Sequence, residues 1–124
     1  DVYKRQPKID KTLIRKIYNK CNNNQWNSIP IDDFIRLLNC DNSRTLSIKK
    51  DEFNRTKVVF KNIANSIKDK GSRKKWIEFI KKEVFNNVDF MKATLRTDTS
   101  CEGYSQIDIN FSSFIADLGV SPNK

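Results

Sequence analysis

Hydrophobic residues recur every three or four positions along most of this chain, and this spacing predicts α-helices rather than strands. The periodic segments cover about residues 10–22, 30–39, 50–68, 73–85, 88–96 and 110–119. With only three glycines and three prolines, the composition does not favour a sandwich of many turns. The pattern therefore predicts a mainly α protein, a compact bundle of five to six helices.

Short polar stretches should separate these helices. The Asn-rich run that starts at Asn22 disfavours continued helix, because asparagine side chains compete for backbone hydrogen bonds. Gly71 suits the residue that ends one helix and Ser72 suits the N-cap of the next, so we expect a turn at this pair. Near the C-terminus, Ile107 and Ile109 alternate with polar residues as in a strand, whereas Phe111, Phe114, Ile115 and Leu118 repeat as in a helix. Residues 107–118 can therefore begin as either, and we expect a short extended segment before a helix from about Asn110.

The first six residues, DVYKRQ, resemble the translation of a sequencing adapter at the end of an assembled metagenomic gene. Residues 1–7 are therefore expected to be either non-native or an ordinary frayed N-terminus. The remainder has the length of one domain, and we assign residues 8–124 to a single helical domain.

Charge changes this picture from a plain helical bundle to a basic one. The chain has 24 Lys and Arg residues against 15 Asp and Glu, a net charge of +9. Residues 49–83 alone contain twelve basic and five acidic residues, so most of the excess lies in one segment. Clustered cations gain free energy from counterion release on phosphate, so a nucleic acid or another polyanion is the expected partner. The alternative is that these charges only form a solvated helix face.

Within that segment, GSRKK at residues 71–75 places cations beside the predicted start of a helix, where free backbone N–H groups also favour anions. Trp76 falls on the apolar stripe of the same helix, so we expect it to pack in the core rather than stack on a base. The candidate nucleic-acid-binding residues are Lys68, Lys70, Ser72, Arg73, Lys74, Lys75, Lys81 and Lys82.

Catalytic and metal-binding chemistry has little support. The chain has no histidine and only three cysteines, which excludes Cys/His zinc sites and histidine general bases. It has no Gly-rich phosphate loop, and adjacent acids in a helix point to different sides. We therefore predict no catalytic residues and no cofactor, although a magnesium-dependent nuclease based on Asp and Glu stays open. The odd number of cysteines, the lack of a signal peptide and the lack of an apolar run of about 20 residues predict a cytoplasmic protein with reduced thiols and no membrane partner.

The segment 22–33 resembles a degenerate EF-hand loop. Its ligand positions are occupied by Asn22, Asn24, Trp26, Ser28 and Asp33. Calcium requires several hard oxygen ligands and a bidentate acid at the last position, and an indole cannot serve as a ligand. We therefore expect no calcium binding, and the alternative is an ordinary polar loop between two helices.

Two further stretches resemble the C-terminal domain of RteC-type regulators from conjugative mobile elements of gut bacteria. They are LIRKIY at residues 13–18, followed by an Asn-rich turn and residues 31–38, and KGSRKKWIE at residues 70–78. The resemblance implies a helical, winged-helix-like DNA-binding protein that controls excision and transfer of the element. The predicted function is thus a DNA-binding accessory or regulatory protein that uses a basic, helix-turn-helix-like segment 49–85. The alternative is a non-catalytic protein–protein adaptor on a helical scaffold, to which the degenerate EF-hand-like loop would belong.

Overall fold

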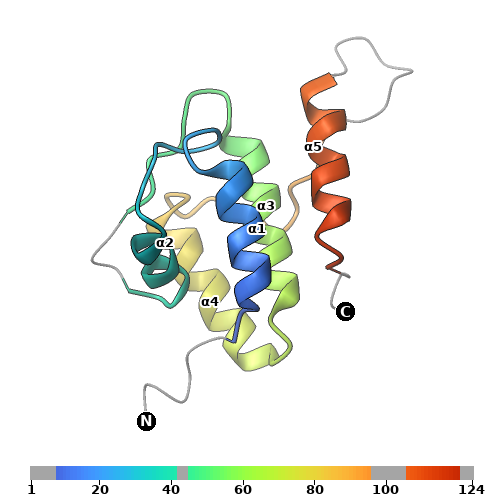
Figure 1. The fold of residues 1–124 in the computed structure, drawn as a ribbon. Helices are drawn as coiled ribbons and strands as arrows, with labels where there is room; N and C mark the ends of the chain where they lie inside the picture. Colours follow the sequence, from blue (N-terminus) through green and yellow to red (C-terminus); the bar gives the residue numbers. More distant parts are fainter. Residues whose placement is uncertain (1–7, 42–44, 96–105, 121–124) are drawn as a thin grey trace.

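The computed structural model describes residues 8–41, 45–95 and 106–120. These contain five helices, α1 (Lys11–Cys21), α2 (Ile31–Leu38), α3 (Phe53–Ser66), α4 (Lys70–Glu83) and α5 (Gln106–Asp117), and no strand among the described residues (Figure 1). The prediction of a mainly α bundle is confirmed. Residues 1–7, for which an adapter origin or fraying was predicted, lie outside the described part.

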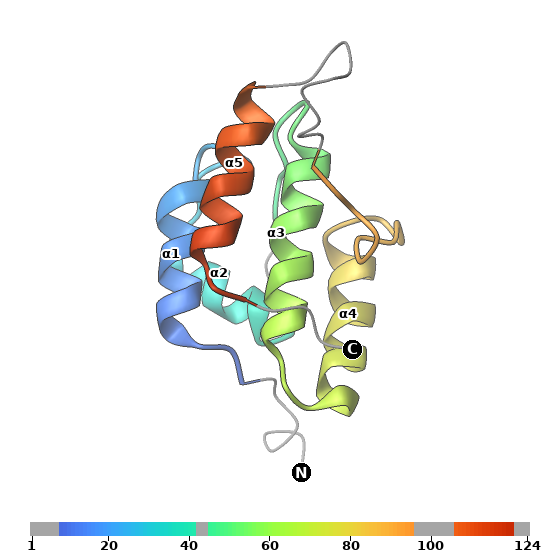
Figure 2. The same ribbon diagram turned by 90° about the vertical axis from the view of Figure 1, so that its right-hand side faces the viewer.

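Helix α3 lies at the centre of the arrangement. The chain reverses direction after α3, so that α4 runs back alongside it as an antiparallel hairpin, while α5 packs against α3 from another side (Figure 2). Helices α1 and α2 contact each other, and α1 and α4 lie on either side of α3 (Figure 2). Because α4 is supported mainly along one side, the opposite side of this helix faces outward.

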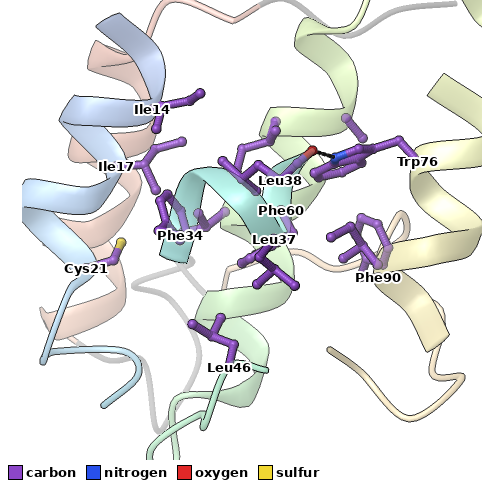
Figure 3. Close-up of a cluster of buried hydrophobic side chains, with 14 of the residues drawn as sticks. Ile14, Ile17, Cys21, Phe34, Leu37, Leu38, Leu46, Phe60, Trp76 and Phe90 are labelled. Carbon is purple, nitrogen blue, oxygen red and sulfur yellow. Dashed lines mark hydrogen bonds between the residues drawn. The ribbon is translucent and has the colours of Figure 1, made fainter. Parts of the chain in front are cut away.

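Aromatic rings form the middle of the hydrophobic core. Phe60 of α3 is fully buried and stacks on Trp76 of α4 with ring centroids 6.2 Å apart. On another side it meets Trp26, from the loop before α2, at 6.1 Å, and Trp26 in turn stacks on Phe34 at 5.4 Å. The indole Nε1 of Trp76 donates a hydrogen bond of 2.8 Å to the Leu38 carbonyl (Figure 3). The expected core position of Trp76 is confirmed, and this residue fixes α4 against the end of α2.

The turn between α3 and α4 differs from the prediction. Helix α3 ends at Ser66, and α4 begins at Lys70 with Asp69 as its N-cap. Gly71 therefore lies in the first turn of α4 and ends no helix, and Ser72 is not the N-cap. The prediction was wrong because the Asp69 carboxylate is a strong acceptor placed upstream, and it takes the Ser72 N–H at 2.7 Å.

The helix predicted over residues 88–96 does not form in the part that is described, residues 88–95, where the chain is irregular apart from a turn at residues 91–92. Asn86 and Asn87 both have left-handed backbones, with φ of 51° and 67°, which turn the chain away from the axis of α4. Carbonyl groups later in the segment then accept hydrogen bonds from Asn54 at 2.8 Å and Lys61 at 3.1 Å, both in α3. These contacts with α3 replace the hydrogen bonds of a separate helix.

The extended segment predicted near Ile107 and Ile109 is also wrong, because α5 already begins at Gln106. The alternating pattern is compatible with either structure, and the contacts with α3 select the helix. Asp108 pairs with Arg55 at 2.6 Å, and Phe111, one turn further along on the same side, is almost fully buried.

Candidate nucleic-acid interface

Helix α4 separates its apolar and basic residues onto two sides. Trp76 and Ile80 are fully buried and define the inner side of the helix. At 100° per residue, the lysines on the opposite side form two rows. One row contains Lys70, Lys74 and Lys81, and the other contains Lys75 and Lys82, with Glu78 between the rows. We call these five lysines the lysine face.

The lysine face is unneutralised within the described part of the chain. Lys70, Lys74, Lys75 and Lys82 are exposed and Lys81 is half-buried, and none of the five forms an ion pair or a side-chain hydrogen bond with another described residue. At a rise of about 1.5 Å per residue, the two rows extend for roughly 16 Å and 10 Å. The face therefore offers several solvated ammonium groups held at fixed spacing by a rigid helix.

The start of α4 is less suited to an anion than the sequence suggests. The backbone hydrogen bond from Ser72, and after it the bond from the Ser72 hydroxyl, lowers the pKa of the Asp69 carboxyl from its ordinary value of 3.8. The carboxylate therefore stays ionised at neutral pH and occupies a backbone N–H that was expected to hold phosphate. A phosphate at this position would meet a negative charge, so the cations must be considered along the helix rather than at its end.

Two further candidate residues face elsewhere. The guanidinium group of Arg73 donates a hydrogen bond of 3.0 Å to the Ile67 carbonyl and so braces the turn between α3 and α4. Lys68 is exposed but lines a separate groove of about 310 Å³ together with Leu13 and Leu118. Of the eight residues selected from the sequence, five thus share the lysine face. The remaining three either shape the turn, as Ser72 and Arg73 do, or point to another surface.

Sequence reasoning missed a second group of cations, Lys8, Lys11 and Arg15, which gather at a groove between α1 and α2. These residues lie outside the basic segment 49–83, so the charge excess that identified that segment did not point to them. The available signal was the i, i+4 spacing of Lys11 and Arg15 next to the apolar residues of α1.

The residues at the EF-hand-like positions of the α1–α2 loop bond mainly to the loop itself. Asn22 accepts a hydrogen bond from the Ile29 N–H at 2.9 Å and donates one to the Ser28 hydroxyl at 3.3 Å. Asn24 donates to the carbonyl of Lys20 at 2.7 Å, and Trp26 is fully buried. Across the residues that the structure describes, no group of three or more His, Cys, Asp and Glu side chains could hold a metal ion.

The two described cysteines are free thiols whose reactivity is lowered by burial. Burial raises the pKa of the Cys21 thiol to about 12, and burial also raises the pKa of the half-buried Cys40. Neither sulfur is therefore an effective nucleophile at neutral pH, since the thiolate is the reactive form. Cys101 lies outside the described residues.

Among the helices described, none combines the length and the apolar composition needed to cross a membrane. Comparisons with protein-family models, with curated proteins and with solved structures find no match to this chain.

Proposed function

We propose that the lysine face of α4 binds nucleic acid, most simply duplex DNA, and that the protein acts as a non-catalytic accessory or regulatory factor. The observation that carries this proposal is the set of five lysines without an acidic partner, on the outer side of a helix whose inner side is locked into the core. Phosphate binding would release counterions from DNA, which gives such a surface a favourable free energy without any change in its structure. The resemblance of residues 70–78 to DNA-binding regulators of mobile elements points in the same direction.

The chemistry of the face favours contacts with phosphate over the reading of bases. Lysine provides a point charge, whereas specific recognition of guanine is typically made by the planar fork of arginine. Arg73, the arginine of α4, donates to the Ile67 carbonyl in the turn. We therefore propose a binding mode whose affinity depends little on base sequence.

The arrangement of α3 and α4 also bears on how DNA would be held. A DNA-binding helix-turn-helix presents the N-terminal residues of its second helix to the major groove. In this protein α4 runs back along α3, and Lys81 and Lys82 in its last turn belong to the same face as Lys70 in its first (Figure 2). The proposed contact therefore runs along the length of α4 and follows the phosphate backbone.

A salt titration of duplex binding tests the proposal. Fluorescence anisotropy of a labelled duplex, measured over a series of NaCl concentrations, should give a linear relation between the logarithms of the binding constant and of salt. Lys74→Ala should lower the magnitude of the slope by about 0.9 if this side chain neutralises one phosphate, with the same change for duplexes of different sequence. Lys16→Ala is the matched control, because Lys16 is also an exposed lysine and belongs to α1, which lies on the other side of α3.

Glu78 provides a variant with the opposite sign. Its carboxylate lies between the two rows of lysines and should repel a bound phosphate, so Glu78→Gln should strengthen duplex binding. Absence of binding by the native chain at low salt would refute the proposal. Equal slopes for Lys74→Ala and Lys16→Ala would show that only the net charge matters and that α4 is not the interface.

A further inference from the structure

A groove of about 380 Å³ lies between the start of α1 and the end of α2. Its apolar surface comes from Ile9, Ile14 and Ile35, and its basic residues are Lys8, Lys11 and Arg15. None of its lining residues belongs to α4, so the groove is separate from the lysine face. The volume lies at the small end of the range for ligand sites, which suits one inserted side chain with its flanking backbone better than a large cofactor.

The charges around this groove are all of one sign. No acidic residue lines it, and Lys8, Lys11 and Arg15 are exposed without an ion pair to any described residue. The nearest acid in sequence, Asp10, uses its carboxylate to accept the Thr12 N–H at 3.0 Å as the N-cap of α1. Lys11 and Arg15 are four residues apart on one helix, where like charges repel and destabilise the helix. An anionic ligand would relieve this repulsion.

From this combination we propose that the groove binds an acidic segment of a protein partner, which inserts one aliphatic side chain between Ile14 and Ile35. The inserted group would leave water against the half-buried Ile9 and Ile35 and against the 7% of Ile14 that is exposed, and the three cations would pair with carboxylates on both sides of it. Nucleic acid fits this groove less well. Its lining contains no aromatic ring on which a base could stack, and an isoleucine wall offers nothing to a phosphate. The proposal is independent of nucleic-acid binding by α4.

The test uses the full chain and a fluorescein-labelled peptide that carries one leucine flanked on both sides by aspartate and glutamate. Anisotropy at low salt should show saturable binding, and the double variant Lys11→Glu/Arg15→Glu should weaken it by about tenfold or more, because attraction becomes repulsion at two positions. A second peptide, with serine in place of leucine, should also bind about tenfold more weakly, since it lacks the inserted apolar group. Far-UV circular dichroism of each variant verifies that the helices are intact.

The matched control is Lys74→Glu/Lys82→Glu, which makes the same charge change on the lysine face and should leave peptide binding within about twofold of native. Three results would overturn the proposal. These are no saturable binding of the leucine peptide, equal binding of the leucine and serine peptides, and equal losses from the groove and α4 variants. Displacement of the peptide by duplex DNA, together with loss of DNA binding in Lys11→Glu/Arg15→Glu, would instead assign the groove to the nucleic-acid interface.

Discussion

The loop between α1 and α2 and helix α5 show opposite relations between composition and burial. The loop begins with the polar run Asn22–Gln25, yet its Trp26 is fully enclosed in the core. Helix α5 contains several aliphatic and aromatic residues, but only Phe111 is buried and Ile107 is 62% exposed. Polar composition thus does not make the loop peripheral, and apolar composition does not make α5 central.

Hydrogen bonding explains the difference. The loop backbone pairs with the segment before α3, where Asn27 N–H donates to Ser47 O at 2.9 Å and Lys49 N–H donates to Gln25 O at 3.0 Å. Tyr18 of α1 donates its hydroxyl to the Ile29 carbonyl at 2.6 Å. Because these polar groups are satisfied within the protein, the loop can pass next to the core and place an indole inside it. In helix α5 the backbone hydrogen bonds are made within the helix, so only one of its sides has to pack against the rest of the protein.

The largest effect is expected at Trp26. Trp26→Ala should lower the free energy of unfolding by about 3–5 kcal/mol, because the indole packs against Phe34 and Phe60 and its removal leaves a cavity. Urea denaturation followed by circular dichroism measures this loss, and Trp26→Phe should cost clearly less because it keeps one ring. A loss below about 1 kcal/mol for Trp26→Ala would place the loop at the periphery and reverse the comparison.

An intermediate effect is expected where α5 docks. Asp108→Ala removes a short, largely buried ion pair with Arg55. Burial by itself lowers the pKa of the Arg55 guanidinium, but the hydrogen bonds that Arg55 donates to Glu52 and Asp108 raise this pKa overall. The expected cost is about 1.5–3 kcal/mol, the usual range for a hydrogen bond between charged groups. Hydrogen exchange should become faster in α5 while α4 keeps its protection. The control is Asp117→Ala, at an exposed position of the same helix, and equal effects of the two variants would argue against the ion pair as the anchor.

A smaller effect is expected at Asn22. Asn22→Ala removes the acceptor of the Ile29 N–H and should cost about 1 kcal/mol, since both groups are only partly buried. Asn27→Ala should be nearly neutral, because the side chain of Asn27 is exposed and its ladder bond is made by the backbone. If the two variants lost the same stability in urea denaturation, the side-chain bond of Asn22 would not be what closes the loop.

The smallest effect concerns acid pH. The hydrogen bonds that the Asp69 carboxylate accepts from Ser72 lower its pKa in the folded protein below the ordinary value of 3.8. The ionised cap therefore contributes stability at pH values above 3.8, and this contribution is lost as the pH falls through the pKa of the folded protein. Asp69→Asn can still accept a hydrogen bond at the cap but does not titrate. The variant should therefore show a shallower loss of thermal stability between neutral and strongly acid pH. Identical pH profiles for the native chain and the variant would contradict the assigned shift.

Four of the helices could be predicted from apolar periodicity because their stripes coincide with the buried residues of α1 to α4. The helix predicted after Asn87 does not form because side chains distant in sequence, Asn54 and Lys61 of α3, donate hydrogen bonds to carbonyl groups of this segment. The sequence of the segment itself does not show these contacts. The start of α5 was predicted wrongly because the contact that decides it, between Arg55 and Asp108, joins residues far apart in the chain.

The candidate interface was predictable in part. The local charge excess identified the segment that contains α4, and helical periodicity placed Trp76 on its buried side. Two features of the charged surfaces could not be predicted from the distribution of charge along the sequence. The capping of Ser72 by Asp69 depends on where the helix begins, and the groove beside Arg15 requires the packing of α1 against α2.

The positions of the two tryptophans have a spectroscopic consequence. Both indoles are fully buried and both contact Phe60, but Trp76 donates its N–H to the Leu38 carbonyl whereas the buried Nε1 of Trp26 has no acceptor among the described residues. Indole emission shifts to shorter wavelength in a less polar, unbonded setting, so Trp26 should emit at the blue edge of the spectrum and Trp76 slightly to the red. The native chain thus carries two intrinsic fluorescent probes, one that responds to opening of the α1–α2 loop and one that responds to movement of α4.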